Sequence, residues 1–168
     1  MGAPVLVEAF KYKHWADRRT VDAVRAIDAD AHPSSLSFAR QQLNHMIRVE
    51  ELFRARLLAE PEPHSSTNTE QVPDLAELDR RLMASNDWFA SYVASTDLTA
   101  LTDRLGFRFV DGNRGAMTRE EILFHVINHG TYHRGAIGHA LDLARTSRPA
   151  DTYTVFIHAA EPHRRKEV

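Results

Sequence analysis

The chain has 168 residues, with 21 basic and 23 acidic side chains and a formal net charge of −2, and this length predicts a single domain spanning residues 1–168. It contains no cysteine, which excludes disulfides, thiolate metal sites and cysteine nucleophiles, and its interspersed charges argue against a nucleic-acid partner. Because it has neither the apolar stretch of a signal peptide nor a run of roughly 18 apolar residues, we expect a cytoplasmic protein without membrane association.

Two amphipathic helices are predicted in the first 60 residues. Apolar residues recur at helical spacing over about residues 4–30. The segment His32-Pro33-Ser34-Ser35 interrupts this pattern, and one of its serines is expected to cap a second helix that runs to about Glu60. Residues 61–73 are polar, rich in proline and serine and without a period, which predicts an exposed loop.

The second half of the chain predicts two further helices with a hairpin between them. The third helix spans about residues 74–95. Alternating apolar residues and the turn sequence Asp111-Gly112-Asn113 predict a short hairpin over residues 103–117. Thr118 and Glu121 form a capping-box signature, so a fourth helix should cover about residues 119–145. Residues 151–160 favour a short helix or a strand.

These elements predict an all-α fold: a four-helix bundle with a short β-hairpin before the fourth helix. Such bundles place their metal sites between side chains of facing helices. The helices are therefore the natural place to look for ligands.

Three histidines stand four residues apart in the predicted fourth helix, at His125, His129 and His133. Residues four apart share one helix face and lie about 5–6 Å apart at Cβ, so neighbouring imidazoles can bind the same cation. The outer two are about 12 Å apart along the axis, whereas two nitrogens bound to one metal are at most about 4 Å apart. A complete site needs one neighbouring pair, either His125 with His129 or His129 with His133, and a ligand from another segment.

His45, in the predicted second helix, is the best-placed candidate for that further ligand because it flanks the apolar side of the helix. His14 in the first helix is a weaker candidate. Four other histidines are expected to be solvated or peripheral: His64, His139, His158 and His163.

The segment HVINHGTYHRG resembles the signature of the DinB/YfiT-like family of metal-dependent proteins, whose fourth helix typically carries the pattern N-H-x-x-x-H-R-G-Q. YKHWADRR resembles the first helix of that family and LNHMIRVEELF resembles its second, so the resemblance covers most of the chain. It implies one divalent cation bound by a histidine of the second helix and two histidines of the fourth. At the matching positions these are His45, His129 and His133.

The resemblance also bears on the neighbours of these ligands. His125 would line the pocket or contact a bound group. Ala136 stands where the family often has glutamine, so a polar or dimer contact made there is not expected in this chain. Tyr132 and Arg134 flank a ligand position and are expected to serve in packing or in a dimer contact.

Carboxylates near the site are less informative. Glu50 and Glu51 follow the histidine of the second helix by about one turn, but a solvated helix face or an ion pair with Arg54 is their expected role rather than catalysis. Gly130 occupies the place of the glutamate base in H-E-x-x-H peptidases, which argues against a peptidase of that type.

Three neutral imidazoles leave a divalent cation, whether zinc, nickel or iron, with open coordination positions. Such a cation can lower the pKa of a bound water to about 7, or bind and activate a thiolate. The resemblance implies a homodimeric hydrolase or a transferase that uses a low-molecular-weight thiol, acting on a small-molecule substrate. The alternatives are a non-catalytic metal-binding or stress-response module and an interaction scaffold.

Overall fold

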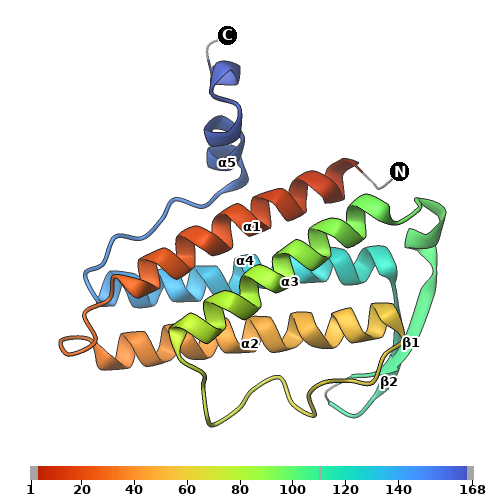
Figure 1. Cartoon of the computed structure of the whole chain (residues 1–168), viewed down its shortest axis with the longest axis horizontal. Helices are drawn as coiled ribbons and strands as arrows, with labels where there is room; N and C mark the ends of the chain where they lie inside the picture. Colours follow the sequence, from red (N-terminus) through yellow and green to blue (C-terminus); the bar gives the residue numbers. More distant parts are fainter. Residues whose placement is uncertain (1–3, 110, 166–168) are drawn as a thin grey trace.

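The structure is a computed structural model that describes residues 4–109 and 111–165. Within these ranges the chain is mostly helical, with one small two-stranded antiparallel sheet (Figure 1). The elements in chain order are α1 (Pro4–Arg25), α2 (Pro33–Leu58), α3 (Leu75–Ser95), β1 (Arg104–Arg108), β2 (Arg114–Thr118), α4 (Arg119–Leu143) and α5 (Tyr153–Ala160). Two short 3₁₀ turns, Thr99–Thr102 and Pro162–Arg165, follow α3 and α5.

The four long helices pack in contact along their lengths. Helix α1 lies against α3 and α4, and α2 lies against the same two helices. Helix α5 contacts α1 and extends away from the other four (Figure 1). Residues 153–160, in the segment for which the sequence allowed a helix or a strand, form a helix. In this helix Phe156 packs against Tyr12 and Trp15 of α1.

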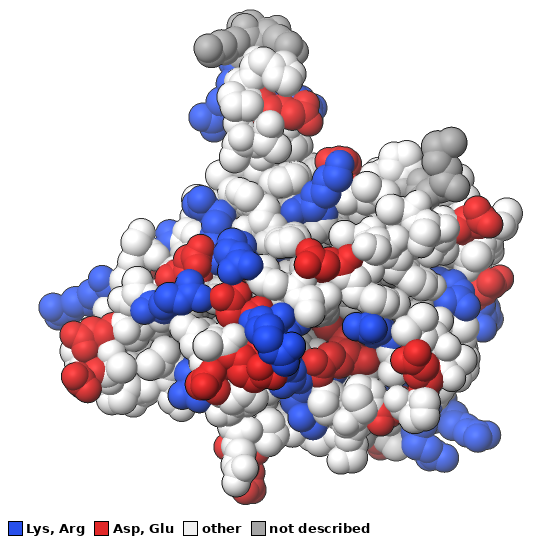
Figure 2. Space-filling view, in the orientation of Figure 1, with Lys and Arg blue, Asp and Glu red and all other residues white. Residues whose placement is uncertain are grey.

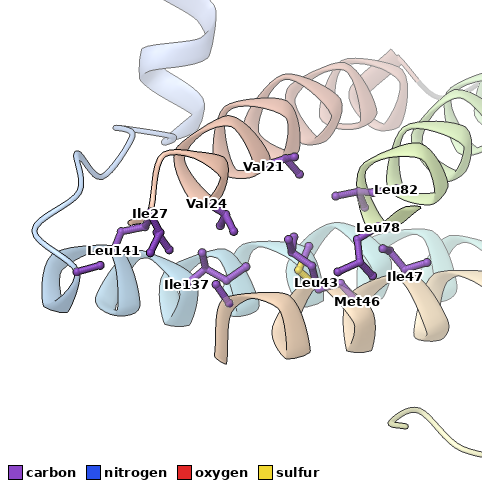
Figure 3. Close-up of a cluster of buried hydrophobic side chains, with 12 residues drawn as sticks. Val21, Val24, Ile27, Leu43, Met46, Ile47, Leu78, Leu82, Ile137 and Leu141 are labelled. Atoms are coloured by element: carbon purple, nitrogen blue, oxygen red, sulfur yellow. The ribbon is translucent and has the colours of Figure 1, made fainter. Parts of the chain in front are cut away.

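Apolar side chains fill the space between the four long helices. One cluster joins Val24 of α1, Leu43 of α2, Leu82 of α3 and Ile137 of α4, all of them buried, and Figure 3 shows these side chains pointing between the ribbons. Full burial of such a side chain contributes about 1.5–3 kcal/mol. A second cluster lies toward the hairpin and includes the stacked rings of Phe10 and Phe89.

Two helix boundaries differ from the prediction. Helix α1 ends at Arg25 rather than near residue 30 because the Asp28 carboxylate accepts hydrogen bonds from the main-chain N–H groups of Asp30 and Ala31, a turn that competes with the helix. Helix α2 begins at Pro33 without a serine cap. Proline fits this first position because its φ is already helical and no N–H is needed there.

The hairpin leads directly into α4. Strand β1 pairs with β2 in the register Arg104 to Thr118 through Arg108 to Arg114. The predicted capping box is present, since the Thr118 hydroxyl accepts from the Glu121 N–H and the Glu121 carboxylate accepts from the Thr118 N–H. Because Thr118 is both the last residue of β2 and the N-cap of α4, the sheet determines where the histidine-bearing helix begins.

The loop of residues 61–73 is held against α2 by main-chain contacts. Arg40 donates to the carbonyl oxygens of Val72 and Pro73 at 2.9 and 2.6 Å, and Arg48 donates to that of Ser66 at 2.7 Å. The loop is therefore fixed over the outer side of α2, although many of its side chains are exposed.

Acidic and basic side chains are intermixed on the face that Figure 2 presents, which lies over α1 and α3. Among the described residues, no helix combines the length and the apolar character needed to cross a membrane.

Candidate metal centre

Helices α2 and α4 bring three imidazoles to one point. The Nε2 atom of His129 lies 3.1 Å from Nε2 of His45 and 3.0 Å from Nε2 of His133. Two nitrogens bound to the same metal at about 2.1 Å are at most about 4 Å apart. The three side chains are therefore close enough to bind one metal ion.

Two of the rings are oriented by acceptors on their far sides. His45 Nδ1 donates to the carbonyl oxygen of Thr67 in the loop at 3.2 Å, and His133 Nδ1 donates to Oε1 of Gln42 on α2 at 2.6 Å. Since both partners accept, each Nδ1 carries the proton and each Nε2 presents a lone pair to the common centre. Sequence reasoning missed Gln42, although its position three residues before His45 places it on the same side of α2.

The third ring, His129, lies between the other two. Its Nδ1 is buried and has no hydrogen-bond partner among the described residues. Since His45 and His133 carry their protons on Nδ1, only the Nε2 atom of His129 can carry a proton among the three that converge. At least two Nε2 lone pairs then face the common centre, with at most one N–H group to donate to them. A bound cation satisfies such an arrangement, and the residues present fit a divalent metal.

Burial keeps the imidazoles of His129 and His133 neutral. It lowers the pKa of His129 to about 3, with further lowering by the charges of His133, His45, His125 and Lys13. Burial and the neighbouring His45 lower the pKa of His133 to about 4. Because a metal binds the neutral imidazole, these two ligands are ready for it at neutral pH.

The metal-free protein should therefore lose stability as the pH falls. Below the ordinary pKa of 6.5 the unfolded chain protonates His129 and His133, whereas the folded chain does so only near pH 3 and 4. The unfolded state thus binds more protons, and the free energy of unfolding decreases between about pH 6.5 and pH 4. Urea unfolding of the metal-free protein at pH 7.5, 6 and 5 measures this slope. A slope that is unchanged in the His129→Gln, His133→Gln double variant would contradict the assignment.

A cavity of about 280 Å³ lies beside the histidine cluster, two of whose members, His45 and His129, line it. His125 also lines it, and its ring stacks 5.2 Å from that of His129. Burial lowers the pKa of His125 as well. The structure thus places His125 beside the histidine cluster and in the wall of the cavity, outside the group whose nitrogens converge.

The other candidates from the sequence lie elsewhere. His14 faces Asp87 of α3 at 3.6 Å and does not join the cluster. The prediction that His64 is solvated is wrong, since its side chain is partly buried and its Nε2 atom contacts the Glu51 carboxylate. Of the peripheral histidines, His139 and His163 are exposed, whereas His158 is half-buried.

The expected roles of Glu50 and Glu51 are also wrong. Glu51 pairs with Arg81 of α3 rather than with Arg54. Glu50 is buried between the helices, where it accepts from Ser85 and pairs with Lys13. Neither carboxylate is free, because each is held by basic groups on neighbouring elements.

Lys13 is the centre of a buried ionic network that sequence reasoning did not find. Its Nζ lies 2.7 Å from Asp17, 2.7 Å from Glu50 and 2.8 Å from the Asn86 amide oxygen. Burial alone would lower the pKa of Lys13, but the two carboxylates outweigh it and raise that pKa. A Cβ at Gly130 would lie 3.4 Å from Lys13 Cε, so this network reaches the backbone beside the central histidine.

The residues that flank His133 behave differently from each other. Arg134 is buried and pairs with Asp17 of α1 and with Asp151 at 2.8 Å each, which confirms a packing role. Tyr132 is 74% exposed, and its contribution to a dimer contact stays a prediction.

Comparison with protein families identifies a relationship over almost the full sequence. The model of the DinB family matches residues 1–166, which is essentially the whole chain and includes all three converging histidines. Comparisons with curated proteins and with solved structures found no match. The chain belongs to the DinB family.

Proposed function

We propose that this protein is a single-domain four-helix bundle that binds one divalent metal ion through His45, His129 and His133 and acts as an enzyme on a small molecule. The observation that carries the proposal is the convergence of three Nε2 atoms beside a cavity. Family membership and the histidine cluster support metal binding. We propose zinc, nickel or iron as the ion, because imidazole suits all three.

A divalent ion bound there would supply Lewis acidity and an open position at which a water or thiolate nucleophile is activated. The residues around it prepare the site. Thr67 and Gln42 hold two rings in the tautomer that presents Nε2, and burial keeps His129 and His133 unprotonated. The mainly apolar wall of the cavity gives a bound substrate surroundings less polar than water, in which electrostatic interactions are stronger.

Two reaction types fit this arrangement: hydrolysis of a small molecule, and transfer that uses a low-molecular-weight thiol. The cavity next to the cluster favours an enzyme over a non-catalytic metal-binding or stress-response module, because a purely structural site is closed by its protein ligands.

Metal binding can be measured directly on untagged protein, which avoids the histidines of a purification tag. After dialysis against metal-free buffer and reloading with zinc, nickel or iron(II) in separate samples, elemental analysis is expected to give about one ion per chain for at least one metal. Retention of no metal, together with no binding in competition against a chelating dye, would overturn the proposal. Retained metal would count against a scaffold that only inherited its histidines.

A further inference from the structure

We propose that the cavity beside the histidine cluster selects a substrate with a small uncharged aromatic or branched aliphatic group, attached to a head group that coordinates the metal. This inference rests on the proposed function and names its substrate class. It follows from the size of the cavity, the chemistry of its walls and the position of the histidines.

The volume sets the size of the group. A cavity of about 150 Å³ holds benzene, and pockets for drug-sized ligands begin at about 300 Å³. At about 280 Å³, this cavity holds one substituted ring or a branched chain of similar bulk. The substrate portion bound there is small.

The walls are apolar. Helix α2 contributes Val49, Leu52 and Phe53, strand β2 contributes Met117, and the hairpin contributes Phe109. His45 and His129 border the same space, so a group that fills it has its head beside the converging nitrogens. An apolar body and a coordinating head therefore fit one molecule.

Among the described residues that line the cavity, Arg56 carries the one permanent charge, and its guanidinium is already engaged. It donates to Glu62 at 2.8 Å and to the carbonyl oxygen of Arg108 at 3.2 Å. Its plane also lies over the rings of Phe53 and Phe107, at 5.2 and 4.3 Å from their centroids. An anionic group in the cavity could pair with Arg56 only by displacing these partners. The group that binds in the cavity is therefore uncharged.

Phe109 and Gly115 limit the size of the cavity on the side of the hairpin. A Cβ built on Gly115 would lie 2.6 Å from Cε2 of Phe109, a distance that real side chains do not tolerate. The absence of a side chain at position 115 thus lets the Phe109 ring lie on the hairpin as part of the cavity wall. These two residues determine how large a group the cavity accepts.

The test uses zinc-loaded protein and three hydroxamates that share one zinc-binding head: acetohydroxamate, benzohydroxamate and 2-naphthohydroxamate. Calorimetry is expected to show that benzohydroxamate binds at least tenfold more tightly than acetohydroxamate, because its ring leaves water for an apolar wall. The naphthyl compound should gain nothing further. Equal affinities for the acetyl and phenyl compounds would overturn the proposal.

Variants then test the wall. Phe109→Ala is expected to raise the affinity for the naphthyl compound relative to the phenyl compound at least fivefold, and Gly115→Ala is expected to change the phenyl affinity by displacing the Phe109 ring. Phe124→Ala is the matched control, since Phe124 is 64% exposed on α4 and does not line the cavity. Identical affinity ratios in the Phe109 and Phe124 variants would also overturn the proposal.

A metal-free arm separates this inference from the proposed function. With ¹³C-methyl-labelled methionine, toluene should shift the Met117 signal, assigned through Met117→Leu, but not that of Met83, which packs in the other core cluster. A Met117 shift in a protein that fails to bind metal would retain the apolar site and reject the metal proposal. Tight zinc binding without a toluene shift and without a phenyl preference would reject the apolar site alone.

Discussion

Replacing His133 with alanine is expected to weaken metal binding at least about a hundredfold while the fold persists. Substituting a residue that only orients a metal ligand already costs 10- to 100-fold in affinity, so loss of one of three ligands should cost more. The half-buried position of His133 makes the truncation tolerable to the helix. Competition with a chelating dye measures the affinity, and circular dichroism checks the helix content.

His125→Ala is the matched control on the same helix face. Its ring lies beside His129 but outside the converging nitrogens, so its loss is expected to change metal affinity by less than about threefold. The comparison decides between the two pairs that helix geometry alone leaves open. A larger loss in His125→Ala than in His133→Ala would reject the assigned ligand set.

Replacing Lys13 with methionine is expected to destabilise the protein by about 3–5 kcal/mol, the usual cost of breaking a buried ion pair by removing one partner. Lys13 is fully buried, and its loss leaves Glu50 without a positive partner. Asp17 keeps its contact with Arg134. Chemical denaturation of the variant and the parent, both without metal, measures the difference in the free energy of unfolding.

Two further variants define the origin of that effect. Lys11→Met removes a lysine two residues earlier whose ion pair with Glu8 is exposed, and it is expected to leave the free energy of unfolding unchanged within experimental error. Adding Glu50→Gln to Lys13→Met removes the uncompensated charge and should recover part of the loss. A double variant less stable than Lys13→Met would show that unpaired charge is not the cause.

Local signals in the sequence were sufficient for several parts of the structure. The capping box at Thr118, the turn between the strands and the row of histidines on α4 each involve residues a few positions apart, so spacing alone predicts their relation. The pairing of His45 with His129 spans 84 positions. The place of His45 on the flank of the apolar helix face made it a candidate ligand, and the resemblance to a family then predicted its partners. Helix periodicity cannot show which helices face each other.

The buried network illustrates what spacing cannot predict. Glu50 was expected on a solvated helix face because such side chains are almost never fully buried unless paired, and its partner Lys13 lies on a different helix. The cavity poses the same problem, since its wall combines α2 and α4 with Met117 of β2 and Phe109 of the hairpin. These relations depend on tertiary packing.

The attachment of the long loop to α2 has a consequence for how this protein can diversify. Arg40, Arg48 and His45 all bind main-chain oxygens of the loop, at positions 66, 67, 72 and 73, and none of these bonds uses a loop side chain. Most residues there can be exchanged without releasing the segment from its helix. Thr67 belongs to the wall of the cavity, so a change of its side chain can retune ligand preference while its carbonyl still orients the imidazole of His45.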